Sequence, residues 1–178
     1  MTDHDSPGGL DAQVERAVGL ACAQLNRRER TIAEVRLALE RRGVPERAAD
    51  QAIRALVDQG MLDDARFASM FVSDKRELEQ WGRERIMRGL LARGIERSLA
   101  DAALSAGHEP GIGGDGAAEE IDGREAELER ALQILRQRFP QPPRERRDRD
   151  RALGLLLRKG YESELAVDAL AAHARGPR

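Results

Sequence analysis

Three short stretches of the chain end in the same way: LERRG at residues 39–43, LLARG at residues 90–94 and LLRKG at residues 156–160. Each places a leucine four residues before a glycine and a cation directly before that glycine. The helix dipole favours a cation in the last turn, and glycine readily takes the left-handed conformation that closes a helix. The three stretches therefore predict three helix ends of one kind in a single chain.

The residues around each glycine also follow a shared pattern. A second apolar residue stands four positions before the leucine and completes an apolar stripe on the preceding helix. An apolar or aromatic residue follows the glycine, and two more stand six and ten positions after it, on one face of a following helix. The aligned positions are Val35, Ile86 and Ala152 before the glycine, Val44, Ile95 and Tyr161 after it, and Ala49 with Ile53, Ala100 with Leu104 and Ala166 with Leu170.

Each copy leaves room for one more helix before this pair. Residues 11–27, 64–79 and 124–138 place apolar residues at helical spacing, and no alternating run rich in β-branched residues suggests a strand. The predicted fold is all-α, with three tandem three-helix repeats in an elongated array. The predicted segments are a disordered tail at 1–10, repeat 1 at 11–60, repeat 2 at 61–106, a flexible glycine- and acid-rich linker at 107–123, and repeat 3 at 124–174.

The expected linker contains GIGGDG at residues 111–116, which matches the dinucleotide-binding pattern GxGxxG. That chemistry needs a strand before the glycines and a helix N-terminus after them. The preceding SAGHEP is no strand, and Glu119, Glu120 and Asp122 follow, where they would repel a phosphate. We interpret the motif as part of the linker and expect no cofactor.

Composition limits the class of protein. Charged residues make up 35% of the chain and aromatic residues 3%, so aliphatic side chains must fill most of the core. The formal net charge of −2 provides no global field for a polyanion, so any such site must be local. Cys22 is the only cysteine, and no apolar run approaches the ~18 residues of a membrane span. Because the N-terminus also lacks the apolar stretch of a signal peptide, we expect a cytoplasmic protein, and we expect a monomer.

No arrangement of catalytic residues is evident, so we predict neither an enzyme nor a metal site. Asp63 and Asp64 could suggest a metal, but they stand where a helix begins, as an N-cap and a first-turn acid. Cys22 lies on an alanine-rich helix and is interpreted as a small core residue. Trp81 could stack on a base, but a hydrophobic plug at a repeat junction is the favoured interpretation.

The charge is unevenly distributed along the chain. Residues 135–159 carry a local net charge of +6, and residues 107–130 carry −6. One interpretation is a solvated surface with internal ion pairs. The other is a surface that docks onto an acidic protein or a phosphate backbone.

GMLDDARFASMFV at residues 60–72, followed by WGRERIMRGLLARGIE at 81–96, resembles the RecX family of recombination regulators. RERTIAEVRLALERRG at 28–43 and LLLRKGYESELAVDAL at 155–170 fall where the first and third repeats of that family belong. The resemblance covers about residues 12–172, although Trp81 stands where a lysine is expected. It implies a non-enzymatic protein that binds the RecA recombinase filament on single-stranded DNA. Such a protein modulates, mainly by inhibition, the filament's assembly, ATP hydrolysis and strand exchange in recombination and repair.

The candidate partner-binding residues are arginines of the basic segment and of the second repeat. Phosphates of single-stranded DNA are a further candidate partner. Two alternatives stay open: a helix–turn–helix-like DNA-binding regulator and a helical scaffold for an unrelated protein. The candidates are Arg144, Arg146, Arg147, Arg149, Arg151, Arg83, Arg85 and Arg88.

Overall fold

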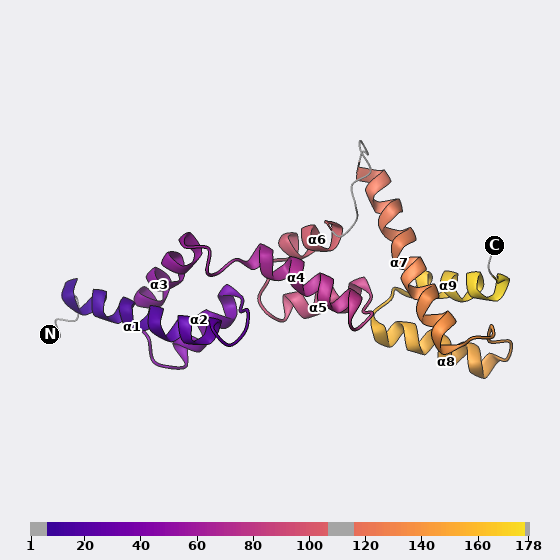
Figure 1. Ribbon diagram of the computed structural model, residues 1–178, viewed down its shortest axis with the longest axis horizontal. Helices are drawn as coiled ribbons and strands as arrows, with labels where there is room; N and C mark the ends of the chain where they lie inside the picture. The colour runs from indigo at the N-terminus through magenta and orange to yellow at the C-terminus, as the bar shows by residue number, and fades with distance from the viewer. Residues whose placement is uncertain (1–6, 107–115, 177–178) are drawn as a thin grey trace.

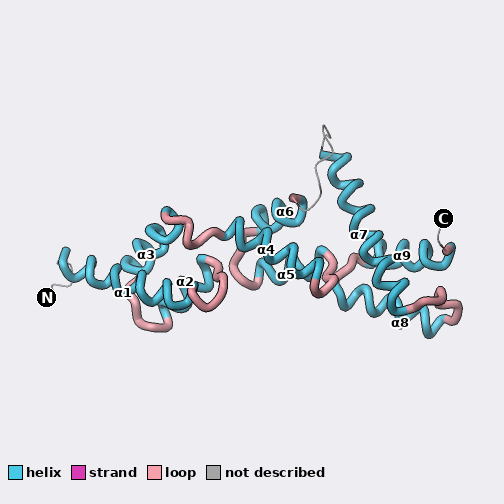
Figure 2. The backbone as a smooth tube through the Cα atoms, in the orientation of Figure 1, coloured by secondary structure: helices cyan, strands magenta, loops and turns pink. Residues whose placement is uncertain are grey.

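The computed structural model describes residues 7–106 and 116–176, and its regular structure within these ranges is entirely helical (Figure 2). The helices follow one another in three groups along the long axis of the molecule (Figure 1). We call these groups repeat 1 (α1–α3), repeat 2 (α4–α6) and repeat 3 (α7–α9). The helices are α1 Pro7–Leu25, α2 Ile32–Glu40, α3 Glu46–Asp58, α4 Asp64–Glu77, α5 Arg83–Leu91, α6 Arg97–Ser105, α7 Gly116–Arg138, α8 Arg146–Lys159 and α9 Ser163–Arg175. The predicted all-α array of three-helix repeats is confirmed.

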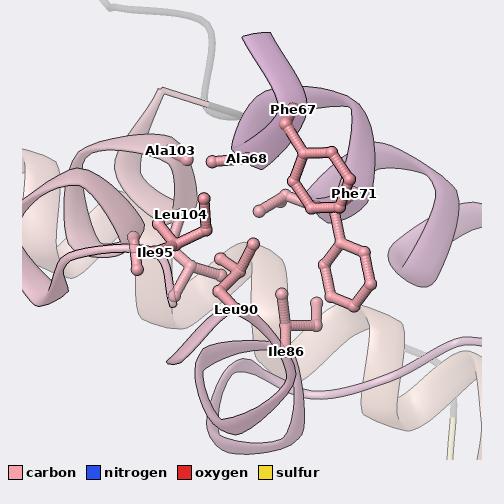
Figure 3. Close-up of a cluster of buried hydrophobic side chains, with 10 residues drawn as sticks. Phe67, Ala68, Phe71, Ile86, Leu90, Ile95, Ala103 and Leu104 are labelled. Atoms are coloured by element: carbon pink, nitrogen blue, oxygen red, sulfur yellow. The ribbon is translucent and has the colours of Figure 1, made fainter. Parts of the chain in front are cut away.

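Each repeat has a hydrophobic cluster of its own. The cluster of repeat 1 brings α1 against α2 and α3, and Leu62, just after α3, closes it. Phe67 and Phe71 of α4 dominate the cluster of repeat 2 (Figure 3), where their ring centroids lie 6.1 Å apart. In repeat 3, aliphatic side chains of α7 and α8 dominate the cluster together with Tyr161. Three small cores, rather than one shared core, make the molecule long.

The three predicted helix ends are confirmed. Gly43, Gly94 and Gly160 have φ angles of 68°, 79° and 87°, in the left-handed region that glycine enters without strain. In each copy the N–H of the residue after the glycine donates to the carbonyl of the leucine four positions before the glycine, at 3.1 to 3.2 Å. This backbone bond and the burial of the three leucines complete a Schellman-type closure of each helix.

Two predicted segment boundaries are wrong. Helix α1 begins at Pro7, so residues 7–10 of the expected tail are helical, with a proline in a first helical position that suits its fixed φ. Helix α7 begins at Gly116, so the expected linker is helical over 116–123. The alanines and glutamates there are strong helix formers and outweigh the two glycines. The remaining parts of both predictions, residues 1–6 and 107–115, lie outside the described residues.

No helix in the described part of the chain is both long and apolar enough to cross a membrane.

Candidate interaction surface

The first contact between repeats joins the start of α2 to the turn between α5 and α6. The Thr31 hydroxyl donates a 2.7 Å hydrogen bond to the carbonyl oxygen of Arg93 and accepts a 3.1 Å bond from the Glu34 N–H. Thr31 is therefore both the N-cap of α2 and a bond between repeats, and it is fully buried. Gly94 fits closely here, because a Cβ added to it would lie 2.3 Å from the Ala33 Cβ.

Asp64 adds a second bond at this first junction. Its Oδ1 accepts a 2.9 Å hydrogen bond from the Ile32 N–H, one of the amides that α2 leaves unpaired at its start. Burial raises the pKa of Asp64 above its ordinary value of 3.8, while the Ile32 hydrogen bond acts in the opposite direction. The neighbouring Asp63 caps α4 as predicted, accepting 2.9 Å bonds from the N–H groups of Ala65 and Arg66. Both carboxylates thus have structural hydrogen bonds.

The second contact joins the start of α5 to the turn between α8 and α9. The Gly82 N–H donates to the Lys159 carbonyl at 2.8 Å, and the Glu84 N–H donates to the Gly160 carbonyl at 3.2 Å. A Cβ added to Gly82 would lie 2.4 Å from the Gly160 oxygen, so the two backbones touch. Gly82 and Thr31 each stand twelve residues before a glycine stop, so the two junctions use one register of the repeat.

The five arginine candidates of repeat 3 lie in and just before α8, and all are exposed. Arg146, Arg147 and Arg151, together with Arg158 and Asp150, line an open hollow on the surface of α8. The ion pairs are long, at 4.0 Å for Arg146 with Asp150 and 3.6 Å for Arg151 with Asp148. Exposed pairs of this kind contribute only about 0–1 kcal/mol, so they leave the guanidinium groups able to exchange partners. We call the five candidate arginines, together with Arg158, the α8 basic patch.

The three arginine candidates of repeat 2 differ in the partners that their side chains contact. Arg83 forms a 2.8 Å ion pair with Asp101, and Arg85 donates a 3.0 Å hydrogen bond to the Arg158 carbonyl at the second junction. Arg88 is exposed and donates to the Glu84 carbonyl within its own helix. Arg83 therefore pairs within repeat 2 and Arg85 bonds across the second junction, whereas neither Arg85 nor Arg88 has a carboxylate ion-pair partner among the described residues.

Trp81 packs against the core of repeat 2 beside the second junction. Its ring meets Phe71 edge-on, with the centroids 6.4 Å apart. The guanidinium of Arg85 lies 4.1 Å from the Trp81 ring centroid and the ammonium of Lys75 lies 4.8 Å from it. These cation–π contacts occupy the ring, which agrees with the predicted plug and leaves little free face for a base.

The described residues contain no group of three or more His, Cys, Asp or Glu side chains placed to hold a metal ion. Cys22 is half-buried and packs against the cluster of repeat 1, as expected of a small core residue. Arg124, one of the two cations of the acidic segment 107–130, forms a 2.9 Å ion pair with Asp168 of α9.

Sequence reasoning missed the atoms that join the repeats. Thr31, Asp64 and Gly82 make the junctions, and the sequence pattern identifies only Asp64, as a first-turn acid. The signal was present for two of them, because Thr31 and Gly82 occupy the same position in the glycine-aligned copies. A polar residue or a glycine recurring at the start of each second helix marks a place where another chain segment approaches.

Two family models match the chain in these same units. The first three-helix domain of RecX matches residues 17–56, and the second matches residues 63–104. Among curated relatives, the regulatory protein RecX of Mycolicibacterium vanbaalenii is 30% identical over 172 residues, covering 92% of this chain and 85% of that protein. The regulatory protein RecX of Trichlorobacter lovleyi is 32% identical over 145 residues, covering 79% and 84%.

Solved structures show a similar arrangement of helices. The crystal structure of RecX from Lactobacillus salivarius superposes with a TM-score of 0.73 at 18% sequence identity, covering 93% of this chain and 98% of that one. A second crystal structure, of a regulatory protein RecX, superposes with a TM-score of 0.67 at 23% identity. At such low identity these likenesses concern the fold alone.

Proposed function

The chain belongs to the RecX family of regulatory proteins, and on that premise we propose that it binds the RecA recombinase filament on single-stranded DNA. It acts there mainly as an inhibitor of filament assembly, ATP hydrolysis and strand exchange, in recombination, repair and the SOS response. The observation that supports this proposal most is the row of three repeats with separate cores (Figure 1). A filament repeats its subunits along an axis, and a row of units can contact several of them.

Several weak contacts are sufficient for such an inhibitor. Once one repeat is bound, the others face the filament at a high effective concentration, so modest affinities multiply. The α8 basic patch supplies one of these contacts, to an acidic protein surface or to DNA phosphates. Contacts with DNA phosphate would make binding fall with added salt, with a slope of roughly −0.9 per neutralised phosphate. We propose that the protein is cytoplasmic and monomeric, and analytical sedimentation tests whether it is a monomer.

The test adds the protein in substoichiometric amounts to RecA filaments on single-stranded DNA and follows ATP hydrolysis. A loss larger than the molar ratio indicates blocked filament growth, and a proportional loss indicates occupancy of the filament surface. Unchanged hydrolysis at every ratio would refute the functional proposal.

A charge-reversal variant tests the α8 basic patch. Arg146→Glu, Arg147→Glu and Arg149→Glu together should weaken inhibition strongly while leaving the helical signal and the melting temperature nearly unchanged. The matched control reverses three exposed arginines of α1, α3 and α6, namely Arg16, Arg54 and Arg97, and so changes the net charge equally. If both variants inhibit equally well, the patch is not a contact.

The structure gives less support to the DNA-reading alternative. In that class of protein the second helix of a pair enters the major groove with polar or basic side chains. Here the N-cap residue Glu162 and the α9 residues Glu164 and Asp168 are exposed, and these acids would repel DNA phosphates. Sequence-specific, salt-resistant binding to one duplex in a gel-shift assay would favour that alternative nonetheless.

A further inference from the structure

A cavity lies between repeat 2 and repeat 3, and it shares no lining residue with the hollow at the α8 basic patch. It has a volume of about 560 Å³, within the range of about 300–1,000 Å³ that small-molecule sites occupy. Helix α4 contributes Ser73 and Arg76 to its lining, and repeat 3 contributes Arg130, Gln133 and Tyr161. We call this space the junction cavity.

Two guanidinium groups line the junction cavity without a carboxylate partner. The Arg76 side chain donates a 2.8 Å hydrogen bond to the Leu104 carbonyl, which is neutral. The Arg130 Nε is buried and has no hydrogen-bond acceptor. Neither guanidinium forms an ion pair within the described part of the chain. The two half-buried guanidinium groups repel each other across this space, and an anion bound to both would relieve that repulsion.

The nearest carboxylates are already occupied. Glu77, which also lines the cavity, accepts a 2.8 Å hydrogen bond from the Ser73 hydroxyl. Glu127 accepts a 2.7 Å bond from the Arg83 N–H at the start of α5. Both acids moderate the positive charge of the cavity, but neither bonds to Arg76 or to Arg130.

The protonation states favour an anion. Burial, with a smaller contribution from the nearby charge of Arg130, lowers the pKa of Arg76 to about 10, so Arg76 stays charged at neutral pH. Burial raises the pKa of Tyr161 to about 12, so its hydroxyl keeps its proton. That hydroxyl lies 3.4 Å from the Gln80 carbonyl, a long hydrogen bond that a better acceptor could replace.

We propose that the junction cavity binds the phosphate group of a small phosphorylated molecule, with Arg76 and Arg130 as its two cations. A phosphate dianion neutralises both guanidinium groups, and its several oxygens suit two planar donor forks better than a single carboxylate does. Tyr161 and Gln133 supply neutral donors beside them. The cavity is larger than one phosphate, so the organic part of the molecule has room.

Binding at this place would couple the second and third repeats. Arg76 belongs to α4 and Arg130 to α7, and at the nearby second junction the two repeats are joined by backbone and side-chain hydrogen bonds but by no ion pair among the described residues. A ligand held by both arginines stabilises the arrangement of the two repeats by mass action. The site therefore acts on the rigidity of the array and does not depend on the proposed partner.

The test titrates the full chain, without RecA or DNA, with inorganic phosphate and with ADP, and measures heat of binding and melting temperature. We expect saturable binding of one equivalent and a higher melting temperature. Arg130→Gln should weaken binding about 10- to 100-fold, the range expected when a charged hydrogen bond is lost. Phosphate should then no longer raise the melting temperature of this variant.

The matched control is Arg136→Gln, which removes an exposed charge from the same helix outside the cavity lining. It should bind like the parent. Tighter binding of ADP identifies a nucleotide as the source of the phosphate, and equal affinity identifies free phosphate. The proposal is overturned if the parent binds neither probe, if Arg130→Gln binds as tightly as the parent, or if acetate binds equally well. Binding that depends on Arg130 but is seen only with a single-stranded oligonucleotide would also overturn it.

Discussion

The two junctions between repeats use the same position of the repeat but different atoms. At the first junction the Thr31 side chain reaches the Arg93 carbonyl, and the Asp64 side chain reaches back to α2. At the second junction Gly82 replaces the threonine, and its backbone N–H makes the equivalent bond directly. A side chain holds the backbones apart, whereas glycine lets them touch. The same register thus supports a side-chain junction and a backbone junction, and the two should respond differently to mutation.

A third turn of the same kind has no partner within the described residues. A Cβ added to Gly43 would meet no atom within 4 Å, whereas one added to Gly94 or Gly160 would meet the preceding repeat at 2.3 Å. Because the three turns have the same conformation, comparing the same substitution at Gly43 and at Gly94 separates the effect of backbone strain from the effect of contact between repeats.

The largest effect should come from Gly82→Ala, because its Cβ would lie 2.4 to 2.6 Å from backbone atoms at Gly160 and Tyr161. Neither backbone can move aside without breaking the second junction, so we expect a loss of about 3 kcal/mol or complete undocking of repeat 3. In this variant, hydrogen exchange should accelerate at the amide of position 82 and at the amide of Glu84, while amides in the core of repeat 1 stay protected. Unchanged exchange at Glu84 would contradict this assignment of the backbone junction.

The variants Gly94→Ala and Gly43→Ala should differ in how much stability they lose. Both variants place an alanine in the left-handed conformation, which costs about 1–2 kcal/mol. Only Gly94→Ala also forces a methyl group onto Ala33. We expect Gly94→Ala to cost about 1–3 kcal/mol more than Gly43→Ala in urea unfolding. Equal losses would mean that the first junction is looser than its geometry indicates.

Thr31→Val should destabilise the first junction by about 1–2 kcal/mol, because it removes both the N-cap of α2 and the bond to Arg93. Thr31→Ser keeps the hydroxyl and should retain most of the stability. Urea unfolding of both variants measures the difference, and a serine variant as unstable as the valine variant would assign the effect to packing of the methyl group instead.

The smallest effect should be a pH dependence at Asp64. Its pKa is raised in the folded protein above 3.8, so the folded state holds this proton more tightly than the unfolded state. Stability from this group is therefore greatest at low pH and falls as pH rises from 3.8 through the raised pKa. Asp64→Asn keeps an oxygen for the Ile32 N–H and should remove this fall. The check is the difference in unfolding free energy between the parent and the variant across mildly acidic pH, and a parent that gains stability over this window relative to the variant would reverse the assignment.

Prediction from sequence succeeded where the determining forces are local. The glycine stops, the buried leucines before them and the Asp63 cap depend on residues within one or two turns of helix, and all three were confirmed. It failed at the start of α7, where the alanines and glutamates sustain a helix despite the glycines on either side of them. The candidate arginines were only partly separable, because Arg83, Arg85 and Arg88 look alike in sequence and differ only in their partners on other helices.

By itself, the sequence determined that this chain forms three copies of one helical unit. Helix length, helix closure and the apolar face of each helix follow from side chains a few positions apart, so a short window contains their causes. Only the tertiary structure decided which atoms join the copies and which cations are left facing a cavity. Thr31 and Arg93 are 62 positions apart, and Arg76 and Arg130 meet across two repeats. Such contacts depend on how whole units pack, and no local pattern encodes that.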